Sequence, residues 1–483
     1  MRRTMIKDIK RPKLTHILSG KGNGVNCFSK IQKYEISKEL ETINFKVLQQ
    51  NHLDNGAKEG SAKYWISNDT NSGDDGKNKI KDQFTSYQKA MKMVIIWGQC
   101  IGINPLTGIL QKDVSKMRFT KCSFQYVFAM IIAGAQFMAT ILAIYRLYKY
   151  PNVGFLGSVA FLSPACLTTI SFIRIAPKWP PLMKEVINSR LDEYIHPRVV
   201  RRCKIASAVY IGMCLVDHAM SIGSNIVHIL ECREGKVVNV LDEYLRGMSS
   251  WLFELNVPFE VWLGMFLEYL NLVNTAAWNY LDIFIVCISL YLTSIMEQIN
   301  KKIHLTASKN YVPASTWGVL RKDYNRATNL IKIFDDMFSG LVVIAFANDL
   351  FAICLQLYNV LAKVIRSPQL IDKICPGNDN SIFRLVFPAY VTYSTAFLIV
   401  RFITMALVAS GVHSSSLVSL PVLYAVPATS FCKEVERFQN QVNTDTVAIS
   451  GLHFFYITRN LVLTVTGTIV TYELVLLQLK TDD

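Results

Sequence analysis

The stretch VPFEVWLGMFLEYLNLVNTAAWNYLDIFIVCISLYLTSIME, residues 257–297, decides the fold class of this chain. A helix needs about 20 mostly apolar residues to cross a hydrocarbon core of about 30 Å. This apolar stretch exceeds that requirement. It therefore predicts a continuous α-helix that crosses a membrane and projects beyond it on the cytoplasmic side.

Six further apolar segments predict the rest of the architecture, and they cover 123–145, 153–176, 204–230, 332–362, 382–408 and 457–479. The segment 332–362 is also too long for a simple span and is expected to continue into the cytoplasm. Composition agrees with this class, because 18% of the residues are charged against about 25% in ordinary soluble domains. The sequence predicts an all-α membrane protein with seven transmembrane helices.

The charges of the connecting loops predict the orientation. Loops 177–203 and 298–331 carry six Lys or Arg residues each, whereas 146–152, 231–256 and 363–381 carry two, three and three. Positively charged loops stay in the cytoplasm, and the strongly basic amino terminus belongs with them. Seven spans then place the carboxyl terminus outside the cell. The same rule explains the net charge of +15 better than a nucleic-acid partner does, so none is predicted.

The segments also predict the domain organisation. Residues 1–83 are polar and basic and are expected to form a largely flexible cytoplasmic segment. The remaining regions are a cytoplasmic helical lead-in at 84–122, a six-helix ligand-binding transmembrane region at 123–408, a cytoplasmic anchor region at 409–456, and the last helix with a short extracellular tail at 457–483.

Two apolar helices carry polar stripes at helical spacing. In the third helix the stripe is Ser207, Tyr210, Cys214, Asp217, Ser221, Ser224 and His228; in the fourth it is Glu268, Asn271, Thr275, Trp278 with Asn279, and Asp282. Steps of three and four residues place each stripe on one helical face. Carboxylates within a span are costly and face a bundle interior or a wet cavity. The stripes therefore predict a polar cavity, and its carboxylates and amides suit the hydroxyl groups of a neutral polyol.

Thirteen residues are candidates for ligand binding: Asp217, His218, Ser221, Glu268, Asn271, Thr275, Trp278, Asn279, Asp282, and more weakly Asp349, Gln356, Tyr390 and Ser394. The alternative is that these groups only form hydrogen bonds between helices, and His218 alone is typical of a core histidine. Arg401 is expected toward a cytoplasmic helix end, where it extends to the surface or forms an ion pair. The sequence predicts no metal site, no cofactor and no enzymatic activity, because no ligand or catalytic spacing is found.

The last helix carries a neutral stripe of Thr464, Thr468, Thr471, Val475 and Gln478. Such a stripe suits the wall of a pore that symmetric copies of the same helix complete. Alternatively, each threonine hydroxyl only bonds its own backbone. Glu473 falls outside the stripe, so a weakly selective pore is favoured over a calcium filter.

The stretch AISGLHFFYITRNLVLTVTGTIVTYELVLLQ at 448–478 closely resembles the signature of insect gustatory receptors, in particular the sugar-receptor branch. Supporting motifs are FIRIAPKWP at 172–180, WNYLDIFI at 278–285 and FCKEVERF at 431–438, and the resemblance covers roughly 84–483. The closing motif of the family is Thr-Tyr, five mostly apolar residues, and Gln-Phe. Here it contains Thr471, Tyr472 and Gln478, with Leu479 in place of the usual phenylalanine.

The resemblance implies a subunit of a ligand-gated, non-selective cation channel in the plasma membrane of gustatory receptor neurons. It implies a homotetramer, or a hetero-tetramer with related receptors, in contact with membrane lipid, and a central pore lined by the last helix. Sugars, mono- or oligosaccharides, would bind an outer-facing pocket among helices two to six. Gln478 and Leu479 take the gate position, where leucine keeps an apolar plug but loses the ring. A metabotropic seven-helix receptor and a membrane sugar transporter are the alternatives.

The predicted orientation can be tested with epitope tags. We expect an amino-terminal tag to be detected only after cells are permeabilised, and a carboxyl-terminal tag in intact cells. The N-x-S/T sequence at Asn68-Asp69-Thr70 should stay unglycosylated, because it lies in the cytoplasm. A glycan on Asn68, detected by a mobility shift on deglycosylation, would contradict the orientation.

Overall fold

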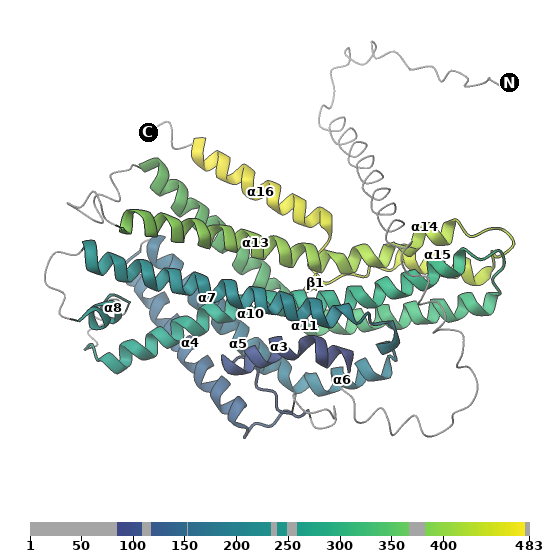
Figure 1. Cartoon of the computed structure of the whole chain (residues 1–483), viewed down its shortest axis with the longest axis horizontal. Coiled ribbons are helices and arrows are strands. Elements are labelled where there is room, and N and C mark those ends of the chain that lie inside the picture. The colour runs from purple at the N-terminus through teal and green to yellow at the C-terminus, as the bar shows by residue number, and fades with distance from the viewer. Residues whose placement is uncertain are drawn as a thin grey trace, which may run out of the picture. The chain divides into compact units, whose positions relative to one another are not determined.

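The computed structural model describes residues 85–108, 117–151, 153–232, 239–248, 258–366 and 382–478. In chain order its elements are α3 (Ser86–Cys100), α4 (Phe124–Lys149), α5 (Val153–Ile175), η5 (Ala176–Lys178), α6 (Trp179–Asn188), η6 (Asp192–Tyr194), α7 (Arg198–Cys232), α8 (Val240–Met248), α10 (Val261–Ala307), α11 (Ala314–Arg366), α13 (Phe383–Leu417), α14 (Ser419–Tyr424), α15 (Lys433–Thr444), β1 (Ser450–Gly451), β2 (Phe455–Tyr456) and α16 (Arg459–Gln478). Figure 1 shows the long helices running side by side along one direction. The predicted helical class is confirmed for the residues described.

Six helical stretches among these residues are long and apolar enough to cross a membrane; they are Phe124–Lys149, Phe155–Asn188, Arg198–Glu231, Val261–Ala307, Ala314–Tyr358 and Phe383–Tyr424. They overlap the first six predicted segments, and their length and composition indicate a multi-pass membrane protein. The seventh segment forms helix α16, and its place as a seventh span stays a prediction. Both segments expected to exceed one span are single continuous helices, α10 and α11.

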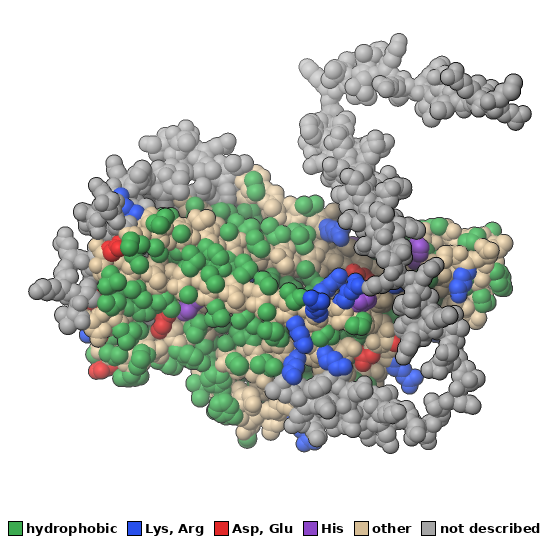
Figure 2. Space-filling view, viewed as in Figure 1, with side chains coloured by type: hydrophobic (Ala, Val, Ile, Leu, Met, Phe, Trp, Pro, Cys, Tyr) green, Lys and Arg blue, Asp and Glu red, His purple; other side chains and the backbone are tan. Residues whose placement is uncertain are grey.

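Helix α10, which contains most of the deciding stretch, lies at the centre of the bundle. It packs against α3, α4, α5, α7, α8, α11, α13 and α14. The most apolar window of α10 is 89% buried, whereas that of α7 is only 17% buried. A helix that is apolar all round is buried by its neighbours, and α7 instead turns apolar side chains outward. Figure 2 shows the resulting apolar surface, which suits contact with lipid.

A short antiparallel hairpin, β1 with β2, leads into α16 and was not predicted from the sequence. Its turn places Leu452 and His453 at φ of 48° and 60°, in the left-handed region. Asp335 of α11 anchors the hairpin, because its carboxylate accepts hydrogen bonds from the Ser450 backbone N–H at 2.6 Å and from the Ser450 hydroxyl at 2.7 Å. The start of α16 is therefore tied to α11.

Helix α3, within the predicted lead-in, begins with a capping box in which Thr85 and Gln88 exchange hydrogen bonds. Its buried face packs on α10 and α7. The contact is closest at Gly98, where an added Cβ would lie 2.5 Å from the hydroxyl oxygen of the buried Tyr280. Only hydrogen fits at this crossing.

We expect Gly98→Ala to destabilise the docking of α3 by about 1–3 kcal/mol, the usual cost of overpacking. Gly212→Ala on α7 is the matched control, because a Cβ there meets no atom within 4 Å among the described residues. Thermal unfolding of the two purified proteins makes the comparison. Equal melting temperatures of the two variants would show that the contact between Gly98 and Tyr280 can accommodate a methyl group.

Candidate functional site

A cavity of about 220 Å³ lies between α4, α5, α8 and α10. Apolar side chains form most of its wall, and a few polar groups converge on it, as is usual for small-molecule sites. Its lining consists of Ala139, Ala143, Arg146, Ser158, Phe161, Leu162, Met248, Leu267, Glu268, Leu270, Asn271 and Asn274. Two of the predicted ligand-binding residues, Glu268 and Asn271, lie in this wall.

Several buried polar atoms at the cavity have no hydrogen-bond partner among the described residues. Asn274 is 1% exposed; its Oδ1 accepts a hydrogen bond from Gln136 Nε2 at 2.9 Å, but its Nδ2 has no acceptor. Neither carboxylate oxygen of Glu268 has a well-aligned donor. A buried group left unpaired costs about 1–3 kcal/mol. The cavity therefore offers one donor and two strong acceptors to a polar ligand.

Glu268 also connects the cavity to α7. Its Oε1 lies 3.5 Å from His218 Nε2, and the hydroxyl group of Tyr244 on α8 faces the same carboxylate. His218 thus has a carboxylate partner on α10, which the sequence did not indicate.

Aromatic and hydroxyl groups of α10 pack behind the cavity wall. The indole N–H of Trp278 donates to the Phe161 backbone carbonyl at 3.2 Å, and the two ring centroids are 5.1 Å apart. The Thr275 hydroxyl donates to the Asn271 carbonyl one turn earlier at 3.0 Å. Trp278 therefore positions Phe161, whose ring lines the cavity.

A second polar cluster joins α7 to α13 in the same half of these helices. Asp217 forms a hydrogen bond with Ser394, and Tyr390 forms hydrogen bonds with Ser221 and Ser394. The structure brings these four predicted residues together. Another predicted residue, Gln356, donates to Thr395 Oγ1 at 3.2 Å and links α11 to α13.

A third cluster surrounds Arg401, which is 4% exposed. Its Nε lies 2.7 Å from Asp282 Oδ2, and its Nη2 donates to Asp349 Oδ1 at 2.8 Å. Its Nη1 donates to Asn279 Oδ1 at 3.1 Å, and its backbone carbonyl accepts from the Tyr210 hydroxyl at 3.3 Å. Three predicted residues, Asn279, Asp282 and Asp349, therefore contact a buried cation and lie outside the cavity lining described above.

The predicted pore stripe lies on the exposed face of α16. Thr464, Thr468 and Thr471 are exposed, while Val465 and Ile469 pack on the core. The hydroxyls of Thr468 and Thr471 donate to backbone carbonyls one turn earlier, each at 2.9 Å. The side chain of Gln478 and the whole of Leu479 lie outside the described residues.

The sequence did not single out Arg146, Ser158, Phe161 or Asn274 as lining residues, nor Gln136 as the partner of Asn274. One signal existed, because Asn274 lies three residues after Asn271 on the same helical face. The others belong to α4 and α5, whose pairing with α10 depends on tertiary packing.

The α-helical fold is similar to one already known from solved structures. The insect olfactory receptor OR5 from Machilis hrabei superposes with a TM-score of 0.52 at 14% identity, over 81% of this chain and 98% of that chain. The structure of that receptor in complex with eugenol gives the same TM-score and identity, over 82% and 99%. At this identity the likeness concerns the fold.

Sequence comparison then identifies the family. The family described as Trehalose receptor matches residues 70–483. Gustatory receptor 64a for sugar taste from Drosophila melanogaster is 30% identical over 81% of this chain and 84% of its own length. The Drosophila gustatory receptor 5a for trehalose is 27% identical over 82% and 86%. The chain belongs to the insect sugar gustatory receptor family, and it is a receptor, not an enzyme.

The Arg401 cluster predicts a large effect on stability. Arg401→Met leaves two buried carboxylates without their cation, and breaking a buried ion pair costs about 3–5 kcal/mol. We expect loss of folded protein at the cell surface and a lower melting temperature after purification. Adding Asp282→Asn and Asp349→Asn to this variant should restore much of the loss. Arg437→Met is the control, because that arginine is 57% exposed; equal effects would contradict the prediction.

Proposed function

We propose that this chain is a subunit of a sugar-gated, non-selective cation channel in the plasma membrane of gustatory receptor neurons. The observation that carries the proposal is the cavity in which Asn274 Nδ2 has no acceptor among the described residues and the Glu268 carboxylate, beside His218 and Tyr244, has no well-aligned donor. The names of the related Drosophila receptors, for sugar taste and for trehalose, support a sugar as the ligand.

The chemistry of the cavity suits a neutral sugar. Ring hydroxyls donate to the Glu268 carboxylate and to the Asn271 side-chain carbonyl, while a ring or hydroxyl oxygen accepts from Asn274 Nδ2. Phe161 offers an aromatic face to the C–H groups of the ring. Because each sugar hydroxyl both donates and accepts, one ligand satisfies the unpaired donor and acceptors together.

The helices that bind the sugar also contact the proposed pore helix through one intermediate layer. Helix α10 carries both the cavity residues and Asp282, and Arg401 joins Asp282 to α13 and Asp349 to α11. Both α11 and α13 contact α16. A shift of α10 on sugar binding is thereby transmitted to α16. Sugar opens the channel only if it binds the open state more tightly.

We further propose that four copies of α16, in a homotetramer or a hetero-tetramer with related receptors, line one central pore. Thr464, Thr468 and Thr471 lie on its exposed face and offer oxygen atoms to passing cations. Gln478 and Leu479 follow at the outer end and form the gate, as the family motif implies. An apolar ring at this point stops ions by dewetting.

The cavity residue Glu268 provides the decisive experiment. We expect Glu268→Gln to shift the sugar dose–response by at least about tenfold, because hydrogen bonds to a charged group contribute about 1.5–3 kcal/mol. Glu260→Gln is the matched control, since that exposed residue precedes the same helix. Currents from cells expressing each variant are measured against a sugar panel and normalised to surface protein.

Two outcomes would count against the proposal. A sugar response of Glu268→Gln equal to that of Glu260→Gln would remove the cavity as the sugar site. A response that is lost in excised patches and needs cytoplasmic components would favour a metabotropic receptor.

A further inference from the structure

The amino-terminal end of α7 carries a concentration of positive charge on the protein surface. Arg198, Arg201, Arg202 and Lys204 are all exposed. Lys301 of α10 is also exposed and lies near the same basic residues. Burial lowers the pKa of His196, and the positive charges of Arg198, Arg202 and Lys301 lower it further. Figure 2 shows Lys and Arg side chains gathered beside the apolar surface.

Acidic groups offset only part of this charge. Glu297, exposed on α10, interacts with Arg202. Asp192 and Glu193 of η6 are exposed as well, but Asp192 interacts with Ser86 and Lys89 on α3. None of the ion pairs between described residues includes Arg198, Arg201 or Lys204. The cluster therefore retains a net positive charge at the surface.

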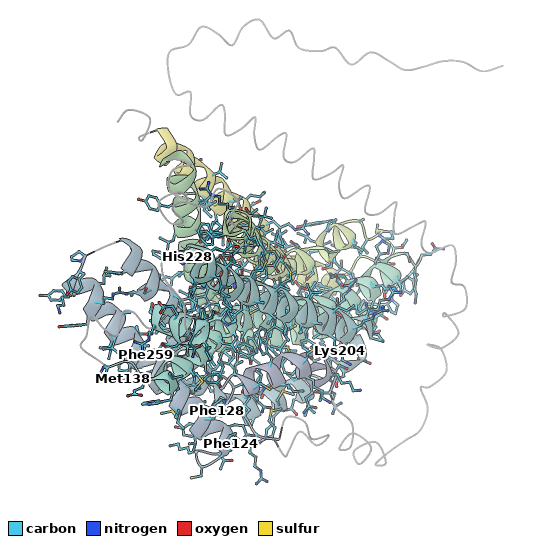
Figure 3. The ribbon with its side chains drawn as sticks, turned by 60° about the vertical axis from the view of Figure 1, so that its left-hand side comes forward. Phe124, Phe128, Met138, Lys204, His228 and Phe259 are labelled. Atoms are coloured by element: carbon cyan, nitrogen blue, oxygen red, sulfur yellow. The ribbon has the colours of Figure 1, made fainter. Side chains whose placement is uncertain are left out.

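The same face of α7 continues as an apolar strip. Arg198, Arg201 and Arg202 are followed on that face by Ile205 and Val209, at steps of three, one, three and four residues. Ile205 is 52% exposed and Val209 is 50% exposed. Further along, Gly212 is open to the surface and Val216 is 47% exposed. Figure 3 labels Lys204 and His228 toward the two ends of this helix.

The dimensions of this strip match those of a membrane lipid. A helix rises about 1.5 Å per residue, so Ile205 and Val216, the two ends of the apolar strip, are separated by about 17 Å along α7. One leaflet of the hydrocarbon core is about 15 Å deep, half of about 30 Å. The arginines therefore lie at the level of the headgroups when the strip faces the acyl chains.

We propose that this face of α7 binds an anionic phospholipid whose headgroup carries more than one phosphate charge. Arg198, Arg201 and Arg202 contact the phosphates, with Lys204 and Lys301 beside them, and the acyl chains lie along Ile205, Val209, Gly212 and Val216. Arginine suits the headgroup, because its planar guanidinium donates two parallel hydrogen bonds to one phosphate. In the orientation predicted from the loop charges, this end of α7 faces the cytoplasmic leaflet, which holds the anionic lipids.

The test uses the purified full-length protein in neutral detergent and dioctanoyl phosphatidylinositol 4,5-bisphosphate as the probe. Binding is measured by native mass spectrometry and by a fluorescent lipid titration. We expect Arg201→Gln with Arg202→Gln to weaken binding by about 30-fold, because each basic residue near an anionic surface contributes about fivefold. The control is Lys309→Gln with Lys322→Gln, which removes the same charge from other exposed positions. Equal affinity of the two double variants would overturn the proposal.

Two further experiments distinguish the contribution of the headgroup to binding from that of the acyl chains. Gly212→Leu fills the strip without a clash, since a Cβ there meets open space. It should weaken binding of the intact lipid and leave binding of inositol 1,4,5-trisphosphate unchanged. Dioctanoyl phosphatidylcholine, which has the same chains and a neutral headgroup, should not compete. If phosphatidylcholine competes equally, the basic cluster does not select the ligand, and the proposal fails.

A second copy of this chain is the alternative occupant of the strip. In that case a cysteine placed at Gly212 would form a cross-link between copies, and the lipid would not protect it. We expect the opposite result, in which the modification of that cysteine by a membrane-soluble maleimide is slowed by the anionic lipid. None of these outcomes depends on the response to sugar, so the proposed function is tested separately.

Discussion

One buried guanidinium links the three long helices α10, α11 and α13 of this receptor. Arg401 of α13 contacts Asp282 of α10 and Asp349 of α11, and Asn279 completes its set of partners. A charged group in an apolar bundle is costly by itself, and the penalty is offset only when partners with good geometry surround it. Because the three partners come from two other long helices, the position of each helix depends on the other two.

Because Arg401 fixes the position of α10, different parts of this helix can serve different purposes. Its first turns contribute Glu268, Asn271 and Asn274 to the cavity, its middle contributes Asp282 to the ion cluster, and the turns from Ile283 to Met296 are largely buried in the core. The polar residues of this helix thus form two groups at different positions along its length. Near the cavity, Asn274 keeps a donor without an acceptor among the described residues, whereas Asp282 and Asn279 both contact the guanidinium of Arg401. We propose that the first group binds the ligand, and that the second holds α10, α11 and α13 in place.

The outer surface follows a different rule. Helix α7 is only 17% buried over its apolar window, whereas neighbouring helices cover 89% of the corresponding window of α10. Its polar groups toward the bundle, including Asp217 and Ser221, meet Ser394 and Tyr390 of α13. Its outward face changes from arginines to aliphatic residues along its length. One helix therefore presents polar groups to the bundle and apolar groups outward.

The sequence by itself determined the helical class, the approximate positions of the long helices and the family, although α11 begins at Ala314 and not at the predicted residue 332. These follow from local properties, because apolar runs of sufficient length must form helices to satisfy their backbone groups in lipid. It also identified Glu268 and Asn271 as polar positions of one helical face. Tertiary structure alone decided which helices face each other. It placed Arg146, Ser158 and Phe161 across from Glu268, and it directed Asp282 to Arg401 instead of the cavity. Periodicity fixes which face of a helix is polar, but the partner of that face depends on contacts between residues far apart in the chain.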